Sequence, residues 1–153
     1  IEENGIDRVE FLFSANLGEE PLSLAKIASG GELSRVMLAI KTILASAEYI
    51  ETLVFDEVDV GISGEVANKV GRKIKSIAQD KQVLCITHSP QIASMGHVNY
   101  LVKKEVQENR TLTRIVQLDQ DEKVRELARM LGGETITETT LRHAQELIKN
   151  LMH

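Results

Sequence analysis

The chain has 153 residues and a net charge of −5, with 42% hydrophobic, 27% charged and 3% aromatic residues. This composition fits one globular domain with a hydrophobic core. It argues against a broad phosphate-binding surface and against an aromatic platform for base stacking, so any contact with nucleic acid would be local or made by another part of the protein. No apolar run reaches the length of a membrane span, and the N-terminus lacks a signal-peptide pattern.

Two details of the sequence bear on its origin. The chain opens on Ile1 instead of a methionine, so we expect a piece of a longer protein. Its one cysteine, Cys85, cannot form an internal disulfide and lies in an apolar run, which indicates a reducing, cytoplasmic setting. Without internal repeats, low-complexity segments or linkers, residues 1–153 are expected to form a single domain.

The first predicted elements are a strand at 7–14, from its alternation, and a helix that begins near Ser29. Ser29 and Glu32 have the spacing of a capping box, and apolar residues continue at helical spacing to about residue 46. Gly30 and Gly31 in its first turn each weaken the helix by about 1 kcal/mol relative to alanine. Glycines there would leave backbone N–H groups open to a phosphate. A flexible cap is the alternative.

The mostly apolar run at 52–55 leads directly into two acids, Asp56 and Glu57. Such a run predicts a strand buried on both faces, as in a parallel sheet. Open α/β sheets bind ligands at the carboxyl ends of their strands. Because burying an unpaired carboxylate is costly, these acids are poor candidates for stabilising a core. An acidic turn without a function is the alternative.

A helix from Ser63 or Gly64 and a strand at 82–87 follow, and the strand ends in His88. Strand, helix and strand in this order predict a right-handed parallel βαβ unit. That unit would bring His88 to the same sheet edge as Asp56 and Glu57. A histidine that merely ends a strand is the alternative.

The rest of the chain predicts a short helix, a β-hairpin and two further helices. Ser89 and Pro90 have the pattern of an N-cap and first helical position, and Gly96 ends the short helix. A pair of glycines at 132–133 stops the next helix. The expected ranges are about 90–96, 98–103, 111–118, 124–131 and 137–151.

Four motifs in this order resemble the C-terminal lobe of an ABC-type ATPase head. The residues S-G-G-E at 29–32 match the signature motif, 53–57 match Walker B, 58–64 match the D-loop, and His88 matches the switch histidine. Each motif alone is a weak signal. Their order and spacing over about sixty residues make the resemblance specific.

Four strings narrow the resemblance: D-E-V-D-V-G-I-S-G, S-G-G-E-L-S-R, I-T-H-S-P-Q-I-A-S and R-E-L-A-R-M-L-G-G. They are similar to the RecN family of bacterial, SMC-like DNA repair ATPases over essentially the whole chain. Ser89 departs from the family pattern, which often has leucine there. A larger departure is that no G-x-x-x-x-G-K-[S/T] phosphate loop occurs. In the family this loop lies in an N-terminal lobe beyond a long coiled coil, so the resemblance implies half a head, inactive alone.

The resemblance implies an α/β fold, the C-terminal half of a P-loop head, with a largely parallel sheet flanked by helices and a β-hairpin. It implies ATP and Mg²⁺ as cofactors, with Asp56 as the metal ligand, Glu57 as the general base and His88 as a γ-phosphate contact. The residues implied to face a nucleotide or the seam with a second head are Ser29, Gly30, Gly31, Glu32, Asp59 and Gly61. Glu32 could instead serve only the capping box.

The implied partners are the N-terminal lobe, a second head in a homodimer, and DNA through the full-length protein, which is expected in the bacterial cytoplasm at the nucleoid and not at a membrane. Two alternatives stay open: a head of another SMC-type chromosome protein, and an ATP-gated dimerisation module with negligible hydrolysis. The string D-E-V-D also fits a superfamily 2 helicase, but the later arginine pattern of that class is missing. Cys85 and His88 supply too few ligands for a zinc site.

Overall fold

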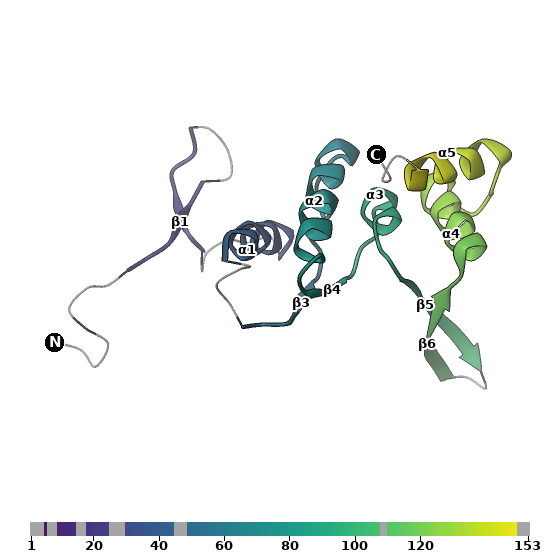
Figure 1. The fold of residues 1–153 in the computed structure, drawn as a ribbon, viewed down its shortest axis with the longest axis horizontal. Helices are drawn as coiled ribbons and strands as arrows, with labels where there is room; N and C mark the ends of the chain where they lie inside the picture. The colour runs from purple at the N-terminus through teal and green to yellow at the C-terminus, as the bar shows by residue number, and fades with distance from the viewer. Residues whose placement is uncertain are drawn as a thin grey trace.

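The structure is a computed structural model that describes residues 5, 9–14, 18–24, 30–44, 49–107 and 110–149, with the backbone alone at 106–107. Figure 1 shows an elongated chain in which the helices line up along one side and a β-hairpin extends from the other. In chain order the elements are β1 (Leu12–Phe13), β2 (Leu22–Ser23), α1 (Gly30–Leu44), β3 (Thr52–Phe55), α2 (Gly64–Ile77), β4 (Gln82–Cys85), α3 (Pro90–Ser94), β5 (Asn99–Gln107), β6 (Arg110–Leu118), α4 (Gln120–Gly132) and α5 (Glu138–Lys149).

The centre of the fold is the unit β3–α2–β4. The two strands pair in parallel, from Thr52 opposite Gln82 to Phe55 opposite Cys85. The ladder extends one step further, because the N–H of Ile86 donates to the carbonyl oxygen of Phe55 at 2.9 Å. The parallel pairing predicted from the order strand, helix, strand is therefore confirmed. Both strands deliver the residues that follow them to the same edge.

The largely parallel sheet implied by the resemblance is not found among the described strands. They form three separate two-stranded sheets, β1–β2, β3–β4 and β5–β6, and only β3–β4 is parallel. The described chain is thus a mixed α/β fold with small sheets. No described strand continues the β3–β4 pair on either edge, because the other strands pair locally with their neighbours in sequence.

One face of the β3–β4 pair is covered and the other is bare. Leu53 and Phe55 are buried and belong to the main core with Leu38 of α1 and the buried stripe of α2. The alternate residues Val54 and Ile86 are 63% and 61% exposed. Burial of β3 on both faces was the sequence prediction and is wrong for this chain. The two-residue period of a strand leaves every second side chain without a covering layer.

Helices α1 and α2 keep the expected positions but differ in the residues they bury. In α1 only Gly31 and Leu38 are buried, whereas Leu33 and Met37 of the expected apolar series are exposed. In α2 the stripe includes Ala67, and Val66 is 40% exposed. Apolar spacing predicts which side of a helix faces the core to within about one residue. The short β3–β4 sheet covers only part of that side, so some of its apolar residues stay exposed. The expected end of the first helix, at 45–46, lies outside the described residues.

A second, smaller core lies between α3, α4 and α5, around Leu127, Ala128 and Ala144. Helix α4 begins four residues earlier than its apolar spacing predicted, at Gln120, because Asp119 and Glu122 form a capping box. Its C-cap, Gly133, has φ 78°, a left-handed conformation that glycine adopts without strain. The predicted stop at the glycine pair is confirmed.

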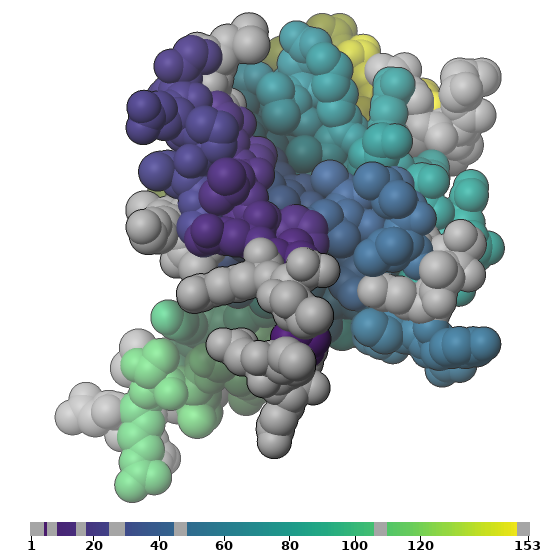
Figure 2. All heavy atoms as spheres, turned by 90° about the vertical axis from the view of Figure 1, so that its left-hand side faces the viewer, coloured from purple at the N-terminus to yellow at the C-terminus, as the bar shows by residue number. Residues whose placement is uncertain are grey.

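The two antiparallel hairpins differ in length. The predicted hairpin is confirmed, and it is longer than expected, with β5 and β6 paired from Asn99 opposite Leu118 to Gln107 opposite Arg110. It projects from the body of the molecule in Figure 2. The N-terminal strand is confirmed over Leu12–Phe13 only, within the described part of the predicted range 7–14.

None of the helices in the described ranges is both long and apolar enough to cross a membrane.

Candidate nucleotide site

The acids at the end of β3 are solvent-exposed and lie beside the end of β4. Asp56 and Glu57 follow Phe55 directly, and His88 follows β4 by three residues. Glu57 has φ 58°, and it is the one non-glycine residue with positive φ in the described ranges. A residue with a Cβ is strained in that region, and such strain persists only where the surroundings hold it. The backbone therefore turns at the second acid, in a conformation that the surrounding structure must hold.

The first turn of α1 holds this strained turn by direct contact. A Cβ added to Gly31 would lie 2.9 Å from the carbonyl oxygen of Glu57 and 3.1 Å from that of Val60. A Cβ on Gly30 would lie 2.8 Å from Oε2 of Glu57. The glycines thus permit the acidic loop to pack against the helix. Phosphate access is the reason for these glycines that the sequence predicts, and close packing is a second reason that only the structure supplies.

Two polar side chains of α1 bind the backbone of the same loop. Ser34 Oγ donates to the carbonyl oxygen of Asp56 at 2.7 Å. Arg35 Nη1 donates to the carbonyl oxygens of Val58 at 3.2 Å and Val60 at 2.8 Å. Neither residue has a role predicted from the sequence. Their partners are carbonyl oxygens, which leave no signal in a sequence.

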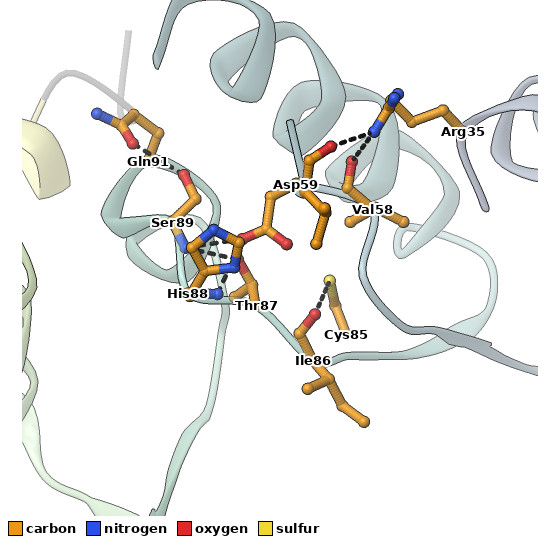
Figure 3. Close-up of polar contacts among 10 residues, drawn as sticks. Arg35, Val58, Asp59, Cys85, Ile86, Thr87, His88, Ser89 and Gln91 are labelled. Carbon is orange, nitrogen blue, oxygen red and sulfur yellow. Dashed lines mark hydrogen bonds and ion pairs between the residues drawn. The ribbon is translucent and has the colours of Figure 1, made fainter. Parts of the chain in front are cut away.

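Asp59 lies inside the molecule and faces the segment after β4. Its side chain is 1% exposed. Oδ2 accepts hydrogen bonds from Thr87 Oγ1 at 2.5 Å and from the backbone N–H groups of His88 and Ser89 at 2.8 Å each. These contacts are drawn in Figure 3. The resemblance implied Asp59 at the seam with a second head. In this chain the carboxylate is buried among donors of its own chain, and a position at the seam stays a prediction.

The same oxygen also faces the ring of His88, whose Nδ1 lies 3.2 Å from Oδ2 of Asp59. Burial by itself raises the pKa of the Asp59 carboxyl. The hydrogen bonds from Thr87 and from the His88 and Ser89 backbone outweigh burial, so its pKa lies below the ordinary value. Asp59 is therefore ionised at neutral pH and only accepts hydrogen bonds. The His88 side chain is 72% exposed, with its far edge toward solvent.

The structure gives fewer contacts for the other predicted site residues. Gly61 is exposed and has φ 73°, which suits a glycine. Glu32 is half-buried in the first turn of α1. Ser29 lies outside the described residues, so the capping box with Glu32 stays a prediction. The structure brings Gly30 and Gly31 against Glu57, and His88 against Asp59.

The donor set at this edge suits Mg²⁺ shared with a nucleotide better than a metal held by protein alone. Within the described ranges, no group of three or more His, Cys, Asp and Glu side chains is arranged to hold a metal ion. Mg²⁺ in phosphate sites is bound by one or two carboxylates together with phosphate oxygens and water. Asp56, exposed at the end of β3, fits that arrangement. Cys85 does not contribute, because burial and the nearby Asp59 and Asp56 raise the pKa of its thiol to about 11.

The fold is that of SMC-type ATPases. A solved structure described as "Structural biochemistry of ATP-driven dimerization and DNA stimulated activation of SMC ATPases" matches with a TM-score of 0.51 and 16% identity, over 77% of this chain and 70% of that one. No protein-family model matches the chain.

Sequence relatives are more specific than the fold. The chain is 51% identical over 147 residues to the DNA repair protein RecN of Bacillus subtilis, and 50% identical over 150 residues to that of Haemophilus influenzae. RecN of Treponema pallidum is 51% identical over 145 residues. These alignments cover 96%, 98% and 95% of this chain but 26%, 27% and 25% of the relatives. Along nearly its whole length the chain is a relative of RecN, as its motifs predicted, and it spans about a quarter of these proteins.

Proposed function

We propose that this chain is the C-terminal lobe of the ATP-binding and ATP-hydrolysing head of a RecN-like protein for the repair of DNA double-strand breaks. The observation that carries the proposal is the parallel pairing of β3 and β4. It sets Asp56, Glu57 and His88 at one edge of the sheet, where α/β folds bind ligands. Relatives named as DNA repair proteins and the fold of SMC ATPases support it.

Each of the three residues has a role in phosphoryl transfer to water. Asp56 would hold Mg²⁺, directly or through a water, and the ion would neutralise charge on the phosphates. Glu57, next along the chain, would orient the attacking water and accept its proton. His88 would donate a hydrogen bond to the γ-phosphate.

The site needs a second lobe, because the sequence contains no phosphate loop. We assign that role to the N-terminal lobe of the same protein. The bare face of β3–β4, with Val54, Leu84 and Ile86 at 63%, 49% and 61% exposure, is an apolar surface for such a lobe to cover. The isolated chain is accordingly expected to be inactive, and DNA binding belongs to the full-length protein in the bacterial cytoplasm.

Head pairing would use the first turn of α1. Ser29, Gly30 and Gly31, with Glu32, would face the γ-phosphate bound by a second head, and Gly61 would lie at the seam. Ser29→Arg in the full-length protein should then leave ATP binding by one head intact while preventing ATP-driven dimerisation, measured by sedimentation with and without ATP. Pairing that survives the arginine would exclude this role.

Glu57→Gln in the full-length protein tests the hydrolytic role. The amide keeps the size of the carboxylate but is a poor base, so kcat should fall about 100-fold or more while the affinity for ATP is retained. Turnover at the wild-type rate would remove Glu57 as the base. Turnover by the isolated chain would contradict the need for a second lobe.

An ATP-gated dimerisation module with negligible hydrolysis is the second candidate. One observation favours it: Oε2 of Glu57 lies 2.8 Å from where a Cβ on Gly30 would be, so this carboxylate is turned toward α1. Wild-type protein that dimerises with ATP and shows no turnover would select this candidate.

A further inference from the structure

The segment after β4 depends on Asp59 for its backbone hydrogen bonds. Strand β4 ends at Cys85, and the last ladder bond is made by Ile86. Beyond Thr87, the N–H groups of His88 and Ser89 both donate to Oδ2 of Asp59. A single buried oxygen thus fixes the path of the chain on both sides of the His88 Cα.

The same oxygen orients the His88 ring. Its Nδ1 lies 3.2 Å from Oδ2. Figure 3 shows the His88 ring beside the Asp59 carboxylate. Because an ionised carboxylate can only accept, this contact favours the form of the ring that carries its proton on Nδ1. The other ring nitrogen, Nε2, is then directed away from Asp59, on a side chain that is 72% exposed.

Asp59 is itself held in place on both sides along the chain. Arg35 Nη1 binds the carbonyl oxygens of the preceding and following residues, Val58 and Val60. Val58 is fully buried in the main core. The carboxylate therefore has little freedom to follow a moving ring, so the ring must conform to the carboxylate.

From this geometry we infer that Asp59 is a positioning residue that sets the backbone and ring orientation of His88, so that Nε2 faces the phosphate end of the nucleotide. The inference rests on the proposed ATPase function. The Asp59 side chain is buried and its described contacts are to Thr87, His88 and Ser89, so its effect would be exerted through His88.

Asparagine and alanine at position 59 should differ. In the described part of the chain, Oδ1 of Asp59 is buried without a hydrogen-bond partner. The amide nitrogen of Asp59→Asn can take that place while its oxygen keeps the position of Oδ2 and its donors. Asp59→Ala removes the acceptor altogether. Loss of a residue that orients a functional histidine lowers activity about 10–100-fold in metal sites, and we expect a fall of that order in kcat for Asp59→Ala and a smaller one for Asp59→Asn.

The test is a double-mutant cycle in the full-length protein, with kcat and KM for MgATP measured for Asp59→Ala, His88→Ala and the double variant. If Asp59 acts through His88, the double variant has the kcat of His88→Ala within about twofold, and KM changes little in Asp59→Ala. An undiminished kcat in Asp59→Ala, or effects that multiply in the double variant, would overturn the inference. Should Asp59→Ala fail to fold, Thr87→Val removes one donor to Oδ2 at constant size. The kcat of Thr87→Val should then fall below that of wild type. The kcat of the double variant Thr87→Val, His88→Ala should equal that of His88→Ala.

A second readout does not depend on hydrolysis. In full-length protein labelled with ¹⁵N-histidine, the His88 signals are those lost in His88→Gln. Wild type should show the Nδ1-protonated form, and Asp59→Ala should lose that preference. An unchanged protonation pattern in Asp59→Ala would refute the orienting role, whereas wild-type protein with the expected pattern but no ATPase activity would refute the proposed function alone.

Discussion

Arg35 in α1 donates from Nη1 to the carbonyl oxygen of Val60 at 2.8 Å, across a sequence separation of 25 residues. The same nitrogen reaches the carbonyl oxygen of Val58 at 3.2 Å. Helix α1 and the loop that follows β3 therefore form one hydrogen-bonded unit. A displacement of α1 would therefore reach the acidic loop directly.

Arg35→Ala should destabilise the chain, because it leaves two carbonyl oxygens without their charged donor. Hydrogen bonds to charged groups contribute about 1.5–3 kcal/mol each, and we expect a loss near the lower value since Val60 is exposed and water can replace one bond. The free energy of unfolding from urea titration measures this. Arg35→Lys, which keeps the charge but not the two-carbonyl geometry, is the matched control. Its free energy of unfolding should lie between those of wild type and Arg35→Ala. A wild-type value for Arg35→Ala would show that these bonds do not contribute.

The two glycines of α1 should respond differently to alanine. A Cβ on Gly31 meets backbone, 2.9 Å from the carbonyl oxygen of Glu57, so the acidic loop must move and the protein should be destabilised. A Cβ on Gly30 meets only the end of the Glu57 side chain, which can rotate away. For Gly30→Ala the gain in helix propensity, about 1 kcal/mol, should therefore leave stability unchanged or higher.

Thermal unfolding of the two variants, each the control for the other, measures the difference. We expect Gly31→Ala to unfold several degrees below wild type and Gly30→Ala at or above it. In the full-length protein Gly30→Ala should still lower kcat, because the displaced carboxylate is the proposed base. Equal melting temperatures for both variants would refute the backbone contact.

Asp59 should make the stability of the protein sensitive to acid. Burial raises its pKa, but the hydrogen bonds from Thr87 and the following backbone outweigh burial and hold the folded-state pKa below the ordinary value. A depressed carboxyl pKa contributes stability that is fully present above the unfolded-state pKa of about 4 and is lost as the pH falls through the folded-state value. The free energy of unfolding should therefore decline below about pH 4, more steeply for wild type than for Asp59→Asn, in urea titrations across that range. Parallel pH profiles for the two proteins would contradict the pKa shift.

The sequence predicted the site better than the surroundings of the site. Asp56, Glu57 and His88 could be placed at one sheet edge because the order strand, helix, strand fixes which ends meet. The inward position of Asp59 could not be found in this way. It depends on the turn at Glu57, where a positive φ in a non-glycine residue has no sequence signal, and on donors 28 to 30 residues away.

Burial was harder to predict for a physical reason. The apolar residues of β3 were read as covered on both faces, but only Leu53 and Phe55 have a covering layer in this chain. A sequence shows that a side chain is apolar. It does not show whether the residues that would cover that side chain belong to the same chain segment. The end of α4 was predicted better, because the stop at Gly133 acts locally, whereas its start at the capping box of Asp119 was missed when only the apolar spacing was followed.

The bare face of β3–β4 should determine how the isolated chain behaves in solution. Val54 and Ile86 on this face are 63% and 61% exposed, so Val54→Thr with Ile86→Thr removes apolar surface without opening the core. We expect the free energy of unfolding of the chain to change by less than about 0.5 kcal/mol, while self-association, followed by sedimentation velocity over a range of concentrations, decreases. Phe55→Thr, on the covered face and 5% exposed, is the control that should unfold the chain.

In the full-length protein the double substitution Val54→Thr with Ile86→Thr should lower stability, because an N-terminal lobe would bury both positions. Unchanged stability there would mean that this face is not where the lobe packs.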